Sequence, residues 1–348
     1  MKNVVKLLFD QIKNFFRGYI MSVGTNNSRF LFVIDEACLF QFRDDARQCE
    51  GIRMGYVAGI ALAPRRAKDV LRILYTHYFR DGSIIKGYKV DDAGAVKFID
   101  SLSAFNCDAS FALGDTEIVS LTEASQYLEN FKKDLINYLH QDHPEYQCLT
   151  GEGKQKLLKD VTDLIQNATK VPQEFMNLLM IFEVIIELLQ KTFDRFNNMR
   201  EEPTGIDIII DTQNPRVAEL IKKDFFKVFL FAVTRRDPFN FGKTKFTNVL
   251  GGKRYLNMNE LLTIKTISDK EAPIICGADF IVSFTSKVLR GKINNNVIVD
   301  KLYSLYGEKA EVNHFHPTEK YKFINIPSGF EYAYYKLVKN FPFKENGL

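Results

Sequence analysis

The stretch RFLFVIDEACLFQF, residues 29–42, contains an apolar run that leads directly into two acidic residues. Five consecutive apolar residues, Phe30 to Ile34, predict a buried β-strand. Asp35 and Glu36 follow with no turn residue between them. Because an unpaired carboxylate is costly to desolvate, such a strand either ends at the surface or holds a carboxylate at a metal or proton-transfer site. The rest of the pattern favours the second alternative.

Two further acids occupy comparable positions. The β-branched run IDIIIDTQNPR (206–216) predicts a strand covered on both faces, and it also ends in an acid, Asp211. Asp279 lies in a predicted helix over 270–293, with apolar neighbours at i−4 and i+3 that indicate an inward-facing position. Carboxylates that converge with Asp35 would repel one another, and Mg²⁺ or Mn²⁺ would neutralise them. The spacing alone also fits acids that only cap strand ends.

The remaining pattern predicts an α/β domain with a mixed sheet. Further strands are expected over 55–64, 107–115 and 261–267, and helices over 64–79, 93–105 and 215–227. Residues 121–200 show helical periodicity throughout and predict a helical insertion between strands. The apolar stripe over residues 2–20 predicts an amphipathic helix that either packs on its own domain, docks a partner or lies on a membrane surface.

Composition narrows the function classes. Hydrophobic residues make up 46% and charged residues 26% of the 348, which is typical of a folded protein. A net charge of +4 is too small for nucleic-acid attraction by the whole molecule, so a basic surface must be local. Five cysteines without C-x-x-C spacing argue against a disulfide framework or zinc site and favour a cytoplasmic location. No membrane span is expected, because Glu183 and Glu187 interrupt the most apolar run, 175–190.

One segment supplies a local basic surface. TRRDPFNFGKTKF (234–246) alternates basic and aromatic residues, a composition that suits phosphates and unpaired bases. A solvated loop whose phenylalanines belong to the core explains the pattern equally well. The candidate nucleic-acid contacts are Arg235, Arg236, Lys243 and Lys245 in this segment, with Lys86 and Lys89 expected to face the same cleft.

The order of these motifs resembles the ribonuclease H-like family catalogued as domain of unknown function 3800. That family begins with a strand ending in Asp-Glu-Ser-Gly, continues with a strand rising to a proline, and then has a Glu-Ile-Lys-Gly-Ser-Lys segment. A strand ending in Asp and a Ser-Pro-Leu-Ile-Gln-Leu-Ala-Asp helix follow a helical region. The corresponding pieces here are FVIDEAC, GYVAGIALAP, IIKGYK (84–89), IDIIIDTQ and APIICGAD (272–279), spread over about residues 29–293.

The resemblance implies a fold and an activity. The fold is a ribonuclease H-like mixed sheet flanked by helices, with the core over 25–120 and 201–348. The periodicity described above adds a predicted helical insertion over 121–200 and a predicted N-terminal amphipathic helix over 1–24. The activity is a divalent-metal-dependent nuclease that hydrolyses phosphodiesters of DNA or RNA. Carried over by motif, Asp35, Asp211 and Asp279 are the ligands of Mg²⁺ or Mn²⁺, and Glu36 either ligates the metal or acts beside it.

Two departures from the family pattern keep a second interpretation open. Ala37-Cys38 replaces Ser-Gly, and Ile84 stands where the family has Glu. Asp81, Asp115 and Glu117 are the nearby acids that could replace that Glu. The alternative is a catalytically inactive ribonuclease H-like module that binds nucleic acid or a protein partner. The N-terminal helix and the helical insertion are the candidate surfaces for a protein partner or self-association.

Overall fold

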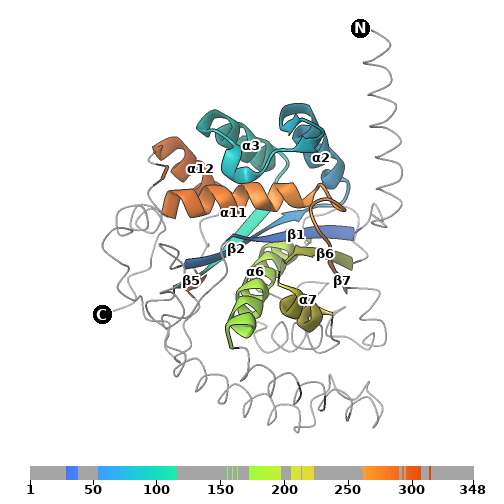
Figure 1. The fold of residues 1–348 in the computed structure, drawn as a ribbon. Coiled ribbons are helices and arrows are strands. Elements are labelled where there is room, and N and C mark those ends of the chain that lie inside the picture. The colour runs from blue at the N-terminus through green and yellow to red at the C-terminus, as the bar shows by residue number, and fades with distance from the viewer. Residues whose placement is uncertain are drawn as a thin grey trace, which may run out of the picture.

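A computed structural model describes the chain in several segments. These are residues 29–37, 54–115, 172–196, 205–212, 214–222, 262–289, 292–293, 295–306 and 313–314, with the single positions 155, 159 and 163. Within them, the strands of the main sheet are β1 (Arg29–Ala37), β2 (Met54–Leu62), β5 (Asp108–Asp115), β6 (Gly205–Asp211), β7 (Leu262–Thr266) and β8 (Asn313–His314). The six form one sheet in the order β7-β6-β1-β2-β5-β8 (Figure 1).

The sheet is mixed, as the sequence predicts. Strands β1, β2 and β5 form an antiparallel meander. On the other side of β1, β6 runs parallel to β1 and β7 runs parallel to β6. The C-terminal ends of β1, β6 and β7 therefore lie at the same end of the sheet. This places Asp35, near the end of β1, next to Asp211, the last residue of β6.

Helices cover both faces of the sheet (Figure 1). One face carries the long helix α11 (Ile275–Leu289), with α2 (Arg66–His77), α3 (Asp92–Ala104) and α12 (Asn296–Tyr306) on the same side. The opposite face carries α6 (Pro172–Phe196) and α7 (Pro215–Ile221). Helix α6 belongs to the predicted helical insertion, yet it packs directly on β2 and β5 and so forms one layer of the core.

Alternation along β1 divides its side chains between the two faces. Leu31 and Val33 belong to the apolar core that β1 shares with α11, and both are at most 5% exposed. Phe32 and Ile34 are also buried, and alternation turns them toward the α6 face. Burial on both faces explains why β1 is almost wholly apolar before Asp35.

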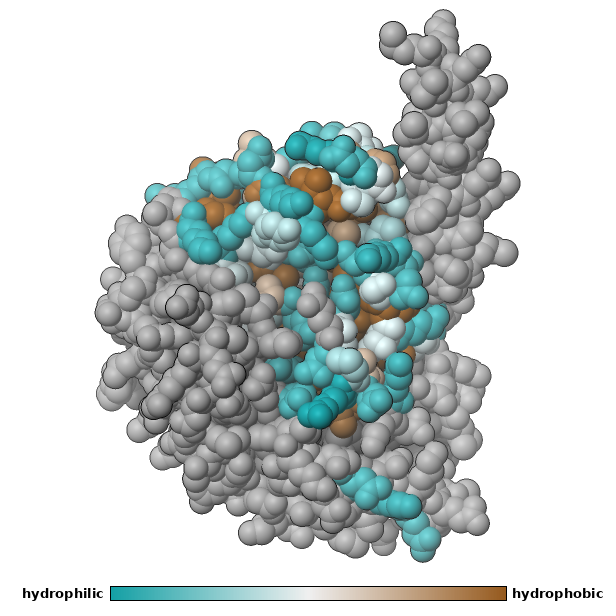
Figure 2. Space-filling view, in the orientation of Figure 1, coloured by the Kyte–Doolittle hydropathy of each residue, from teal (hydrophilic) through white to brown (hydrophobic). Residues whose placement is uncertain are grey.

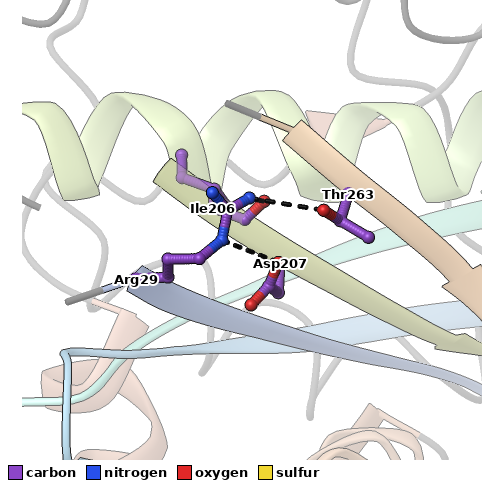
Figure 3. Close-up of polar contacts among 4 residues, drawn as sticks. All are labelled: Arg29, Ile206, Asp207 and Thr263. Atoms are coloured by element: carbon purple, nitrogen blue, oxygen red, sulfur yellow. Dashed lines mark hydrogen bonds and ion pairs between the residues drawn. The ribbon is translucent and has the colours of Figure 1, made fainter. Parts of the chain in front are cut away.

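Arg29 ties together the three parallel strands at the end of the sheet opposite the strand-terminal acids (Figure 3). Its Nε donates to Asp207 Oδ1 on β6 at 2.9 Å. Its Nη2 donates to the Ile206 carbonyl oxygen at 3.1 Å and to Thr263 Oγ1 on β7 at 3.4 Å. Because a register slip would break all of these bonds, Arg29 helps to align β1 with β6.

The described residues include most of the strands and helices predicted for the sheet and its covering layers. The strands expected over 55–64, 107–115 and 261–267 are confirmed as β2, β5 and β7, and the helix expected over 93–105 is confirmed as α3. Helices α2, α7 and α11 are shorter than expected. The N-terminal helix over 1–24 lies outside the described residues. No helix in the described segments is both long and apolar enough to cross a membrane.

Candidate functional site

Asp35 and Asp211 are direct neighbours on adjacent parallel strands. They are paired in the register of β1 with β6, and the strand spacing places their Cα atoms roughly 5 Å apart. Alternation turns both side chains toward α11, the face on which Val33 and Ile209 join the apolar core. Asp35 is 7% exposed, so the first acid of the opening motif is buried in the protein and does not mark a strand end at the surface.

Asp279 approaches this pair from α11. Its side chain is buried, and the carboxylate accepts two hydrogen bonds. The Gly87 backbone N–H donates to Oδ2 at 2.8 Å, and the Ser283 hydroxyl donates to Oδ1 at 3.4 Å. The predicted inward-facing position of Asp279 is therefore confirmed, and the segment that contains Lys86 and Gly87 is docked on it.

Burial and mutual repulsion disfavour the charged forms of all three carboxylates. Burial raises the pKa of Asp35 well above its ordinary value, and the charges of Asp279 and Asp211 raise it further. Burial also raises the pKa of Asp211 and, against the hydrogen bond from Gly87, that of Asp279. A bound cation would relieve both effects, so the electrostatics of the cluster favour a positive partner.

Asp269 is a fourth acid of this group, and the sequence interpretation missed it. It follows β7 in the turn that leads to α11, and its charge adds to burial in raising the pKa of Asp211. Its own carboxylate forms an ion pair with Lys86, Oδ2 to Nζ 2.7 Å. The signal that could have found it is an acid shortly after a third strand, because parallel strands end at a common edge.

Glu36 does not join the cluster. It follows Asp35 on β1, so alternation turns its side chain to the opposite face of the sheet. There its Oε1 accepts a hydrogen bond from the Thr212 hydroxyl at 3.0 Å. This placement gives Glu36 a contact between the ends of β1 and β6 and separates it from the three aspartates that face α11.

Ile84, which stands where the resembling family has Glu, lies in apolar surroundings. Ile84 lies on the two-residue strand β4 (Ser83–Ile84), which pairs with β3 (Phe79–Arg80), and its side chain packs against the hydrophobic core. Asp81 lies in the exposed turn of this hairpin, and Asp115 ends β5, two strands from β1. Glu117 lies outside the described residues.

Lys86 supplies positive charge to the cluster. Burial tends to lower the pKa of Lys86, but the hydrogen bond to Asp269 and the charge of Asp279 outweigh it and raise this pKa above its ordinary value. The Lys86 charge in turn offsets part of the increase in the pKa of Asp35, Asp211 and Asp279, all of which stay raised. A protein ammonium group therefore supplies part of the positive charge that this cluster requires.

The donor chemistry of this site fits a hard divalent ion, since four carboxylates supply only oxygen ligands. As the side chains stand, no group of three acidic, histidine or cysteine residues within the described segments is arranged to hold a metal ion. The aspartates and Lys86 thus form an acidic cluster whose charge is balanced in part by an ammonium group, and ligation by Asp35, Asp211 and Asp279 together requires these side chains to move.

The expected nucleic-acid contacts are only partly described. Lys89 is exposed in the short 3₁₀ turn η2 (Gly87–Lys89), where its Nζ lies 5.7 Å from the ring centroid of Tyr88. Tyr88 is itself 63% exposed. The basic segment with Arg235, Arg236, Lys243 and Lys245 lies outside the described residues. Figure 2 shows mainly hydrophilic residues on the described part of one face, with scattered hydrophobic ones.

Comparison with known proteins adds no family assignment. No protein-family model matches the chain, and no curated protein matches it. The functional interpretation therefore depends on the geometry of Asp35, Asp211, Asp269, Asp279 and Lys86.

Proposed function

We propose that the protein is a divalent-metal-dependent nuclease that hydrolyses phosphodiesters with a ribonuclease H-like carboxylate cluster. The observation that carries the proposal is the in-register pairing of Asp35 with Asp211, with Asp279 buried above them on α11. The mixed sheet, with an antiparallel meander on one side of β1 and parallel strands on the other, supports the ribonuclease H-like assignment.

The residues divide into metal ligands and groups that position them. Asp35, Asp211 and Asp279 would hold Mg²⁺ or Mn²⁺, which when bound supplies an activated water and stabilises the leaving oxygen of a phosphodiester. The Gly87 N–H fixes one oxygen of Asp279. This bond limits the rotation of the Asp279 carboxylate.

Nucleic acid would enter beside the turn that follows Lys86. Tyr88 presents an exposed ring on which an unpaired base can stack, and Lys89 places a cation next to it. The combination favours single-stranded nucleic acid as substrate, since a paired base has no free face for the ring. DNA and RNA both satisfy this chemistry.

The proposal is tested by cleavage of single-stranded, duplex and DNA–RNA hybrid oligonucleotides with Mg²⁺, with Mn²⁺ and with a chelator. Asp35→Asn and Asp211→Asn should each lose at least about 100-fold in metal-dependent rate, because each removes one of the proposed metal ligands. Asp100→Asn, an exposed carboxylate on α3 that pairs with Lys301, is the matched control and should retain activity. Cleavage that survives Asp35→Asn unchanged would overturn the proposal.

A specific observation also favours the second candidate, an inactive module that binds nucleic acid or a protein partner. Ile84 packs against the core where the family has a carboxylate, and Lys86 provides the cluster with its own cation. Under this alternative the protein binds oligonucleotides equally well with a chelator and with Mg²⁺ and cleaves none of them. A protein partner would bind through 1–24 or 121–200, and deletion of residues 1–20 should then change the assembly state.

A further inference from the structure

The feature that the proposed function leaves unexplained is the position of Lys86. Its Nζ lies 2.7 Å from Asp269 Oδ2, and its charge acts on Asp35, Asp211 and Asp279 as well. Its side chain is nevertheless 40% exposed. The side chain therefore reaches the cluster from a partly solvent-exposed position, from which it can swing away.

The backbone that carries Lys86 is held firmly. Gly87 donates to Asp279, and a Cβ at position 87 would lie 2.6 Å from the Asp279 carbonyl oxygen, so only glycine allows so close an approach to α11. The Lys89 N–H donates to the Lys86 carbonyl oxygen at 2.9 Å and closes the turn on the other side. Motion of Lys86 is thus confined to its flexible four-carbon side chain.

We infer that Lys86 is the resident counter-cation of this cluster, that it competes with divalent metal for the carboxylates, and that metal binding releases its ammonium group toward the substrate phosphate. The inference deepens the proposed function and rests on it. A divalent ion and an ammonium group repel each other, so they do not share these carboxylates at close range. The displaced side chain would lie next to Tyr88 and Lys89, where a phosphate backbone is expected.

This inference also explains why the aspartates do not form a ready-made metal site. With Lys86 paired to Asp269, part of the acidic charge is neutralised internally. When Lys86 leaves, repulsion among the remaining charges makes the cluster a stronger cation site. Lys86 is a positioning residue in this scheme, because it controls metal occupancy without ligating the metal.

The first test uses the full-length protein in the presence of a chelator. Lys86→Met keeps the length of the side chain and removes its charge, so it should lower the melting temperature at pH 8 by about 4 °C. The same substitution made in an Asp35→Asn background should lower it by less than half as much, since the cluster then carries less charge. An equal loss in both backgrounds would overturn the role of Lys86 as counter-cation.

The second test titrates Mn²⁺ into the same proteins and measures affinity by calorimetry. Lys86→Met should bind Mn²⁺ about tenfold more tightly than the parent, because the competing cation is gone. Lys97→Met removes an exposed lysine charge on α3, whose Nζ lies beside His77 and outside the cluster, and should match the parent. Equal affinity in the parent and Lys86→Met overturns the competition and leaves the proposed function standing. If neither protein binds Mn²⁺ while the coupling to Asp35 persists, the nuclease proposal fails and Lys86 remains the cation of the cluster.

Discussion

Neutralising Asp35 should make the metal-free protein more stable, although it destroys the proposed activity. Asp35→Asn keeps the shape of the side chain and an oxygen that can accept the Glu36 N–H, which donates to Asp35 Oδ1 at 2.7 Å. What it removes is a buried charge beside Asp211 and Asp279. Two unit charges roughly 5 Å apart repel by about 3 kcal/mol at an effective dielectric constant of about 20. Lys86 offsets part of this, so we expect a gain of about 1–3 kcal/mol at pH 8.

The stability gained by Asp35→Asn should increase with pH. Burial raises the pKa of Asp35 in the folded protein above the value of the unfolded chain, so the folded state binds the proton more tightly. The parent is therefore not penalised below about pH 4, where this carboxyl is protonated in both states. The penalty grows as the pH rises through the window between the two pKa values and is complete above it. The advantage of Asp35→Asn should grow over the same window.

Urea unfolding with a chelator at several pH values measures the difference. The matched control is Asp207→Asn on the neighbouring strand β6, which breaks the ion pair with Arg29 and should lose stability. Saturating Mg²⁺ should raise the stability of the parent, by about 2.7 kcal/mol at 100 times the dissociation constant, and leave Asp35→Asn unchanged. An Asp35→Asn protein less stable than the parent at pH 8 without metal would refute the reasoning, because it would mean that the charge is stabilised where it lies.

Three further outcomes follow from single contacts. Gly87→Ala should destabilise the protein by about 1–3 kcal/mol in urea unfolding, because the new methyl group collides with the main chain at Asp279; a loss below about 0.5 kcal/mol would contradict this close approach. Arg29→Met should lower the free energy of unfolding by about 2 kcal/mol, and by much less in a chain that already carries Asp207→Asn. Equal losses in the two chains would show that the ion pair does not contribute to stability. Tyr88→Ala should weaken binding of a single-stranded oligonucleotide by about tenfold in fluorescence anisotropy without changing stability, and unchanged binding would remove Tyr88 from the interface.

Much of the core was predictable because local patterns reflect burial. The apolar run before Asp35 and the isoleucines before Asp211 indicated strands covered on both faces, and the structure confirms both. The inward position of Asp279 followed from helical periodicity and is also confirmed. The exact ends of α2 and α11 were not predictable, because capping and packing decide them.

The sequence by itself indicated the segments that form β1, β2, β5, β6 and β7 and the acids Asp35 and Asp211 on two of them, since periodicity and composition are local properties. The two-residue strand β8 was not among the predicted strands. Tertiary structure alone decided which acids meet. The parallel register of β1 with β6 paired Asp35 with Asp211. Glu36 is the next residue along β1, so its side chain lies on the opposite face of the sheet. The close approach of Gly87 to α11 brought Lys86 into contact with Asp269, although the two residues are far apart in the sequence. Such contacts depend on the packing of distant elements, and no local pattern encodes them.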